Sequence, residues 1–234
     1  MTDERAAAPA PIDLPALAAI IERMRAAHPA SARLIVGLAG EPGAGKSTVA
    51  AALSAELPGS AVLPMDGFHL PQAELVQLGR RERMGAPDTF DVDAFVTLLE
   101  RLRNPHNSGV TLRAPGFDRR VEQPVPDEIA LTPELSTVIV EGNYLLLDEP
   151  DDGAGWHRVE PLLDLAVGVV LDETVRHERL IARHVAYGKT PEAARAWALG
   201  PDEANASRIA PSLERADYLL TASSSDAAAG SSTR

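Results

Sequence analysis

The sequence predicts an α/β fold in which a parallel β-sheet is covered by helices on both faces. Short apolar runs alternate with helical segments along most of the 234 residues, an alternation typical of parallel sheets. A glycine-rich loop joins one of the first apolar runs to the next helix, and acidic residues directly follow two other runs. Because ligands bind beyond the carboxyl ends of parallel strands, we expect these features to converge at one edge of the sheet.

The elements of the first half follow from the periodicity of the apolar residues. An amphipathic helix is predicted over residues 12–28, before a buried strand at 33–39. The helix-forming segment 47–57 stops at a proline–glycine pair, and the next strand spans 61–65. A polar, arginine-bearing stretch then leads to a helix over 92–102, whose apolar residues share one face.

The second half continues the alternation. An apolar strand at 137–140 ends at Glu141, a second strand spans 165–171, and a last one is predicted at 218–220. A charged helix begins at about Glu173.

These elements predict a single domain over residues 12–222, with a helical lid at about 173–200. A chain of this length can bury a sizeable core. Residues 1–11 and the tail 223–234 are expected to be disordered, because their alanine-, serine- and proline-rich composition offers too little apolar surface.

The composition excludes several classes of protein. The formal charge is −12 and the isoelectric point about 4.9, so nucleic acid and anionic membranes are poor electrostatic partners. The chain has no cysteine, hence no disulfide and no thiolate metal site. No apolar run approaches the roughly 18 residues of a membrane span, and the acidic start lacks the features of a signal peptide. A cytoplasmic enzyme is expected.

The segment GEPGAGKST, residues 40–48, predicts a phosphate-binding loop and with it a P-loop NTPase fold. It satisfies G-x-x-x-x-G-K-[ST] between a buried strand and a helix. Its glycines let backbone N–H groups turn toward phosphate oxygens, and the helix N-terminus adds its positive dipole. Lys46 would reach the β- and γ-phosphates of ATP, and Ser47 would ligate Mg²⁺. The expected nucleotide-binding residues of the loop are Gly40, Glu41, Pro42, Gly43, Ala44, Gly45, Lys46, Ser47 and Thr48.

Two carboxylates at strand ends complete the parts that phosphoryl transfer needs. Asp66 follows the strand 61–65 and is placed to accept the proton of an acceptor hydroxyl. Glu141 stands where P-loop proteins carry an acid associated with the metal ion. Taken alone, Asp66 could belong to a turn-forming Asp-Gly pair and Glu141 to a solvated strand end. Together with the loop, however, the strand ends carry the parts of one reaction, which favours the functional interpretation.

The order of the motifs resembles one kinase family. The phosphate loop is followed by DGFH (66–69), APDTFD (86–91), PGFDRR (115–120) and VIVEG (138–142). These motifs are similar to those of the family of uridine kinase, phosphoribulokinase and type I pantothenate kinase, over about residues 33–220. The likeness is greatest to bacterial nucleoside/nucleotide kinase-like members, some of them linked to sugars such as fructose.

This resemblance implies an ATP- and Mg²⁺-dependent kinase that transfers the γ-phosphoryl group to a hydroxyl of a small metabolite. It assigns proton acceptance to Asp66 and the magnesium-associated carboxylate to Glu141. It also places a substrate-facing segment at 114–120.

The acceptor side departs from the uridine kinases. Those enzymes carry an acid two residues before a Pro-Asp pair, where this chain has Gly85. Asp88 or Asp118 could replace that acid, whereas Asp91 is expected to cap the following helix. The substrate-binding candidates are Asp66, His69, Asp88, Phe117, Arg119 and Arg120. The arginines of this group could equally be solvated, and solvation is expected for Arg80, Arg81 and Arg83.

The lid helix carries arginines on one predicted face, because Arg176, Arg179 and Arg183 are spaced i, i+3, i+7. The resemblance implies that lid arginines neutralise the transferred phosphoryl group, and Arg179 and Arg183 are the catalytic candidates among them. Asn205 resembles a residue of the loop beside adenine and is therefore a nucleotide-binding candidate. No set of metal ligands is expected around His69, His177 and His184.

Two other classes of nucleotide-binding protein are disfavoured. A GTPase would carry the N-K-x-D motif that reads guanine, and this motif is absent. A regulatory module that had lost catalysis would not be expected to keep both Asp66 and Glu141. A nucleoside, a pantothenate-like acid, a sugar and a sugar phosphate all stay open as the acceptor. A homodimer also stays open, since dimers are common in this family.

Overall fold

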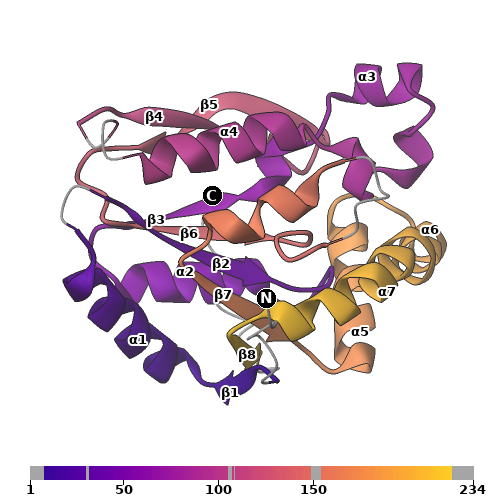
Figure 1. Ribbon diagram of the computed structural model, residues 1–234. Coiled ribbons are helices and arrows are strands. Elements are labelled where there is room, and N and C mark those ends of the chain that lie inside the picture. Colours follow the sequence, from indigo (N-terminus) through magenta and orange to yellow (C-terminus); the bar gives the residue numbers. More distant parts are fainter. Residues whose placement is uncertain (1–7, 30–31, 105–106, 108, 149–153, 223–234) are drawn as a thin grey trace.

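The computed structural model describes residues 8–29, 32–104, 107, 109–148 and 154–222. Within these ranges, six strands form one sheet in the order β1-β8-β7-β2-β6-β3, and every neighbouring pair is parallel (Figure 1). In chain order, β1, β2, β3, β6, β7 and β8 span Ala10–Ile12, Leu34–Ala39, Ser60–Pro64, Thr137–Gly142, Leu165–Val170 and Tyr218–Thr221. The predicted parallel sheet is confirmed.

Helices cover both faces of this sheet, as predicted. On one face lie α1 (Leu14–Ala27) and α2 (Lys46–Glu56) (Figure 1). On the other lie α4 (Val92–Arg103) and an antiparallel hairpin of β4 (Leu112–Asp118) and β5 (Gln123–Leu131). The remaining helices are α3 (Gln72–Gln77), α5 (Glu173–Ala186), α6 (Pro191–Trp197) and α7 (Glu203–Ser212).

The central strand β2 belongs to two cores at once. Leu34, Val36 and Leu38 pack with α1 and α2, whereas Ile35 joins the core beneath α4. Successive side chains of a strand point to opposite faces, so a strand covered on both sides must be apolar throughout. All six residues of β2 are buried accordingly.

The expectation of disorder at residues 1–11 is wrong for residues 10 and 11. They belong to β1, which pairs Ala10 with Tyr218 and extends the sheet beyond β8. Three residues are too few to show a periodicity, and the strand forms because the edge of β8 offers unpaired backbone groups. Residues 1–7 and the tail 223–234 lie outside the described residues.

The polar stretch between β3 and α4 is more ordered than its sequence indicates. A short turn of 3₁₀ helix, Met65–Phe68, follows β3 directly, and α3 then projects from the rim of the molecule (Figure 1).

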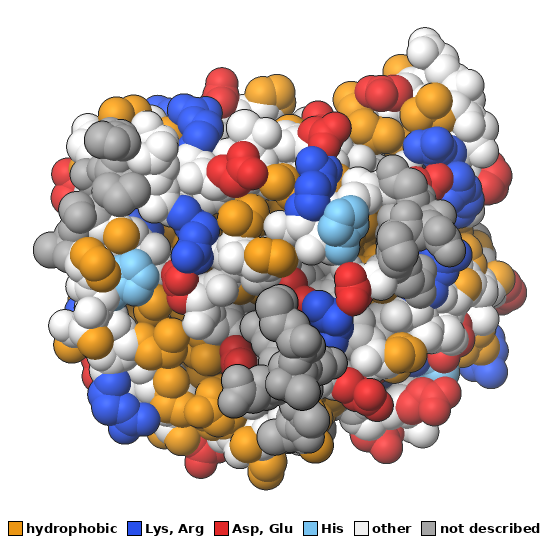
Figure 2. Space-filling view, viewed as in Figure 1, with side chains coloured by type: hydrophobic (Ala, Val, Ile, Leu, Met, Phe, Trp, Pro, Cys, Tyr) orange, Lys and Arg blue, Asp and Glu red, His pale blue; other side chains and the backbone are white. Residues whose placement is uncertain are grey.

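Acidic and basic side chains are interspersed over the face seen in Figure 2, including the region around α3. The cap of α4 is confirmed, because the backbone N–H of Ala94 donates to Asp91 Oδ1 at 2.9 Å.

The register of the sheet brings three strand ends to one level. Ala39 of β2 pairs with Gly142, and Pro64 of β3 pairs with Glu141 of the shared neighbour β6. The residues that follow these strands therefore start from the same edge. The segments α5, α6 and α7 contribute side chains above that edge.

Candidate active site

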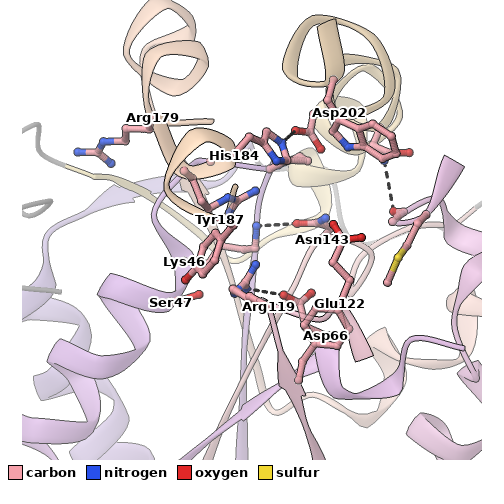
Figure 3. Close-up of a pocket in the computed structure, with 18 of the residues that line it drawn as sticks. Lys46, Ser47, Asp66, Arg119, Glu122, Asn143, Arg179, His184, Tyr187 and Asp202 are labelled. Atoms are coloured by element: carbon pink, nitrogen blue, oxygen red, sulfur yellow. Dashed lines mark hydrogen bonds and ion pairs between the residues drawn. The ribbon is translucent and has the colours of Figure 1, made fainter. Parts of the chain in front are cut away.

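A cavity of about 760 Å³ opens at the carboxyl ends of β2, β3 and β6 (Figure 3). The phosphate loop and Glu141 line one part of it. Asp66, the β4–β5 turn and residues of α5, α6 and α7 line the rest. Within the described residues, the loop and both strand-end carboxylates thus share one cavity, as the sequence predicts.

The phosphate loop has the backbone that its glycines make possible. Gly43 and Gly45 have φ values of +83° and +99°, in the left-handed region that side chains disfavour. α2 begins directly afterwards, at Lys46, so its unpaired N–H groups face the loop. Consecutive N–H groups in such a conformation form a concave anion site. The loop therefore fits the phosphates of a nucleotide.

Lys46 is held by oxygen atoms at the base of this loop. Its Nζ donates to the carbonyls of Gly40 at 2.8 Å and Glu41 at 3.0 Å, and to Asn143 Oδ1 at 2.7 Å. Burial lowers the pKa of Lys46 to about 8, against the opposing influence of the nearby carboxylates. A phosphate oxygen would offer this buried ammonium a charged partner in place of neutral carbonyls.

Ser47 and Glu141 form the pair that could hold a divalent cation. The Ser47 hydroxyl donates to Glu141 Oε1 at 2.9 Å. Burial raises the pKa of Glu141, and the negative charge of Asp66 raises it further. A hydroxyl and a carboxylate beside a phosphate loop are the hard oxygen ligands that Mg²⁺ prefers, so the donor set fits the ion that the sequence implies.

Asp66 lies opposite, where the 3₁₀ turn meets the hairpin. A Cβ on Gly67 would come within 2.1 Å of the Pro115 carbonyl oxygen, so only glycine allows this approach. The approach brings Arg119 to Asp66, and its Nη2 donates to Asp66 Oδ2 at 2.5 Å (Figure 3). Burial alone would raise the pKa of Asp66, but Arg119 and other nearby cations hold it below its usual value. Asp66 is therefore ionised at neutral pH.

An aromatic wall follows Asp66 on the acceptor side. The ring of His69 lies between Phe90 and Phe117, with centroids 3.9 Å and 4.8 Å away. Its Nδ1 lies 2.8 Å from the backbone oxygen of Asp66. Burial lowers the pKa of His69, so the ring is neutral at neutral pH and contributes an apolar face. His69 and Phe117 thus lie in the cavity as predicted, and their roles toward a substrate stay predictions.

Two of the expected substrate residues lie elsewhere. Asp88 forms ion pairs with Arg80 and Arg83 and does not line the cavity. Arg120 has a side chain that is 83% exposed and lies 3.6 Å from Asp118, also away from the cavity. The cavity therefore does not support a substrate role for either residue. Asp88 is held by its ion pairs, and the exposed Arg120 fits the alternative of a solvated arginine.

Arg80, Arg81 and Arg83 are likewise paired rather than simply solvated. Arg81 donates to Glu122, a residue of the β4–β5 turn. Arg80 and Arg83 hold the segment around Asp88.

At Gly85, where the uridine kinases carry an acid, the structure places a backbone carbonyl that is already hydrogen-bonded. The Gly85 carbonyl accepts hydrogen bonds from the Tyr144 hydroxyl at 2.5 Å and from Asn205 Nδ2 at 3.3 Å. Asn205 belongs to helix α7 and is buried against this acceptor-side segment. Asn205 thus lies in a helix rather than in a loop, and it lines the cavity. Its role toward the nucleotide stays a prediction.

The lid arginines separate into two groups. Arg179 and Arg183 line the cavity, and their catalytic role stays a prediction. Arg176 is only 2% exposed and points away from the cavity, donating to Glu203 at 2.6 Å and lying 3.8 Å from Glu41. Arg176 therefore ties the phosphate loop to α7.

The histidines of α5 have partners that the sequence did not reveal. His184 Nε2 lies 2.7 Å from Asp202, and His177 Nε2 lies 2.8 Å from Glu203. His177, Glu173 and Glu203 also lie close enough together to ligate a metal ion. The expectation that no set of ligands surrounds His177 is therefore wrong. Arg176 already occupies Glu203, and a cation there opposes metal binding.

Several residues of the cavity were missed at the level of sequence. Asn143 follows the VIVEG motif directly, and its place after a strand end is the one signal that could have indicated it. Glu122, Tyr187, Lys189, Trp197 and Asp202 also line the cavity. They come from turns and lid segments whose sequences carry no motif.

Comparison with known proteins agrees with this geometry. The sequence matches the model of the phosphoribulokinase / uridine kinase family over residues 35–228. A uridine kinase-like protein of Schizosaccharomyces pombe is 36% identical, over 67% of this chain and 68% of its own. The Escherichia coli protein YggC is 35% identical, over 80% of this chain and 77% of its own.

A solved structure from Silicibacter sp. TM1040, named for a kinase of a fructose transport system, shares 35% identity with a TM-score of 0.77. The match covers 91% of this chain and 100% of that one. The structure of YFH7 from Saccharomyces cerevisiae shows the same fold. It shares 19% identity with a TM-score of 0.74, and the match covers 90% of this chain and 99% of that one.

The parallel sheet, the phosphate loop and the strand-end carboxylates define a P-loop kinase. Because the family model matches most of the chain, the protein belongs to the phosphoribulokinase / uridine kinase family. It is a phosphotransferase that acts on a hydroxyl-bearing substrate, and membership implies the use of ATP. Within the described residues, no helix has the length and apolar character needed to cross a membrane.

The lowered pKa of Lys46 predicts how nucleotide binding depends on pH. Only the ammonium form attracts phosphate oxygens, and this form is lost above about pH 8. We expect the affinity for a non-hydrolysable ATP analogue to fall by up to about tenfold per pH unit above that value. Calorimetry between about pH 7 and pH 9.5 measures this affinity. The variant Lys46→Arg is the control, because an arginine keeps its charge over the whole range. A constant wild-type affinity over this range would contradict the assignment.

Proposed function

We propose that the protein transfers the γ-phosphoryl group of ATP to a hydroxyl of a small metabolite, with Asp66 as the general base. The observation that carries this proposal is the single cavity shared by Lys46, the Ser47–Glu141 pair and Asp66. Phosphoryl transfer needs little covalent chemistry from the protein. Positioning and charge neutralisation supply most of the catalysis.

Asp66 is suited to hold the acceptor hydroxyl and to take its proton. Arg119 keeps the carboxylate ionised and fixes Oδ2, which leaves Oδ1 for the substrate. A carboxylate of lowered pKa is a weak base. This suffices when the phosphoryl transition state is loose, because the hydroxyl becomes acidic only as the new bond forms. Asp66 thus first orients the nucleophile and then accepts its proton.

The remaining charged groups would neutralise the phosphates. Ser47 and Glu141 would hold Mg²⁺, which supplies positive charge to the phosphate oxygens when bound. Lys46 would exchange its carbonyl partners for phosphate. Arg179 and Arg183 reach the cavity from α5 and would stabilise the negative charge of the transferred group.

The acceptor is proposed to be a hydroxylated metabolite other than a pyrimidine nucleoside. Where the uridine kinases present a carboxylate to the ribose, this chain presents a carbonyl that Tyr144 and Asn205 already occupy. The alternative carboxylate Asp88 is bound by arginines. Relatives carry the names of pantothenate kinase and of a kinase in a fructose transport system, so an acid and a sugar are both within the range of the family.

The two carboxylates of the site should give different defects. We expect Asp66→Asn to lower kcat by about 10²–10⁴-fold, the usual effect of losing a positioned base, while an ATP analogue still binds. Glu141→Gln should instead raise the Mg²⁺ concentration needed for half-maximal rate. Steady-state rates over a Mg²⁺ series separate these effects, and Asp118→Asn, a carboxylate outside the cavity, serves as the control. A nearly silent Asp66→Asn would overturn the assignment of the base.

A panel of acceptors tests the function itself. ADP release is measured in a coupled spectrophotometric assay. The acceptors are nucleosides, pantothenate, glycerate, hexoses, pentoses and their phosphates. The variant Lys46→Ala gives the background rate, because it should lose turnover while remaining folded. We expect at least one non-nucleoside acceptor to exceed uridine and cytidine in kcat/KM. Uridine phosphorylation above roughly 10⁴ M⁻¹s⁻¹, the lower end for proficient enzymes, would instead support a nucleoside kinase.

A further inference from the structure

The acceptor side of the cavity holds an ion pair between two elements that are distant in sequence. Glu122 comes from the turn between β4 and β5, and Lys189 from the turn between α5 and α6. Both line the cavity, and Lys189 Nζ lies 3.8 Å from Glu122 Oε1. We propose that Glu122 and Lys189 form a hydroxyl clamp that selects a neutral acceptor with several hydroxyl groups, such as a sugar or a polyol. This inference rests on the proposed function, because it concerns the second substrate of that reaction.

Glu122 is held firmly in a conformation that costs energy. Its φ is +51°, in the left-handed region, although it carries a full side chain. Gln72 Nε2 donates to the carbonyls of Val121 at 2.8 Å and of Glu122 at 3.2 Å, which fixes the backbone of the turn. Arg81 donates to Oε2 and fixes the carboxylate. Strained residues that their surroundings hold in place are concentrated at binding sites.

The distance between the two charged groups leaves a position for a ligand. At 3.8 Å, Lys189 Nζ and Glu122 Oε1 are too far apart for a direct hydrogen bond. A hydroxyl oxygen can accept from the ammonium while its proton is donated to the carboxylate, so a single hydroxyl satisfies both groups. A hydroxyl making both contacts would lie beside the line that joins the two atoms, on the side of the cavity that both groups line.

The charges and rings around the pair favour a neutral polyol over an anion. Arg81 pairs with Oε2 of Glu122, whereas Oε1 faces Lys189. An anionic oxygen at this position could accept from Lys189 but has no proton to donate to the carboxylate, whereas a hydroxyl can do both. Lys189 lies over the ring of Trp197, with Nζ 4.6 Å from the ring centroid, which limits the positions it can take. The rings of Phe117 and Trp197 offer apolar faces for the C–H groups of a sugar or polyol.

The clamp also explains how the chain manages without an acid at Gly85. Of the carboxylates considered as replacements, Asp88 and Asp118 do not line the cavity, whereas Glu122 does. A hydroxyl-binding carboxylate is thus supplied by the hairpin. An acceptor with one hydroxyl at Asp66 and another at the clamp would satisfy both sites, and an acceptor lacking the second hydroxyl would leave two charged groups unbridged.

The test compares acceptors that differ by one hydroxyl. Coupled ADP release is measured at saturating ATP and Mg²⁺ for D-ribose, D-fructose and glycerol. Each is compared with an analogue that lacks one hydroxyl: 2-deoxy-D-ribose, 1-deoxy-D-fructose and 1,2-propanediol. We expect at least one parent compound to exceed its analogue in kcat/KM by about tenfold or more, the effect of losing a hydrogen bond to charged groups.

Glu122→Gln should remove this preference by raising KM for the parent compound, with kcat and the analogue's KM nearly unchanged. Lys189→Gln should act in the same way, and Lys189→Arg should retain part of the preference. Glu128→Gln, which changes an exposed carboxylate of the adjoining strand β5, is the matched control and should resemble the wild type. Melting temperatures of all variants separate these effects from a loss of folding.

The possible results distinguish the clamp from the proposed function. If acceptors are phosphorylated but Glu122→Gln lowers kcat equally for parent and analogue, the clamp is overturned and the kinase assignment stands. The same holds if uridine or an anionic acid is the preferred acceptor and Glu122→Gln leaves its rate unchanged. If the wild-type protein phosphorylates no compound in either panel, the proposed function fails and the clamp fails with it.

Discussion

The arrangement of the site depends on the pairing of β6 with both β2 and β3. Because the three strands are parallel and in register, the loop after β2, Glu141 at the end of β6 and Asp66 after β3 leave the sheet at one level. A shift of one residue along β6 would turn Glu141 toward the opposite face of the sheet. In the observed register, all six residues of each of β2 and β6 are buried.

The charges of the cavity are balanced within the protein itself. Lys46 and Glu141 are buried, and Asp66 and Arg119 are half-buried beside them, so the four charges shift one another's pKa values. A buried charge is costly without a partner, so each of these groups is stabilised by an opposite charge nearby. Hydrogen bonds from Lys46 to neutral oxygens and from Ser47 to Glu141 satisfy the set without substrates. Phosphate and a metal ion would replace these contacts with charged ones.

The sequence predicts the parts of this site that depend on local pattern. The phosphate loop, Ser47 and Glu141 are recognisable because an apolar strand directly precedes each segment, and parallel strands fix where such segments converge. The same logic places Asp66. The sheet and the major helices follow from periodicity, whereas β1 forms only because the edge of β8 is available.

The parts that could not be predicted depend on partners that a local pattern does not show. Asp88 is paired with Arg80 and Arg83, although all three are near in sequence. Arg176 lies on the predicted arginine face of its helix, but it is buried and paired. For Arg176, the partner Glu203 comes from α7. Glu122 and Lys189 meet because the β4–β5 turn and the α5–α6 turn line the same cavity. No spacing along the chain encodes such a pair.

The central claim is that one cavity holds both the nucleotide phosphates and the acceptor hydroxyl. A crystal structure with a non-hydrolysable ATP analogue and Mg²⁺ tests it most directly. The account predicts phosphates on the N–H groups of the loop, Lys46 turned from the carbonyls of Gly40 and Glu41 onto phosphate, a metal ion beside Ser47, and the terminal phosphate facing Asp66. A terminal phosphate directed away from Asp66, or a metal ion remote from Ser47 and Glu141, would contradict it.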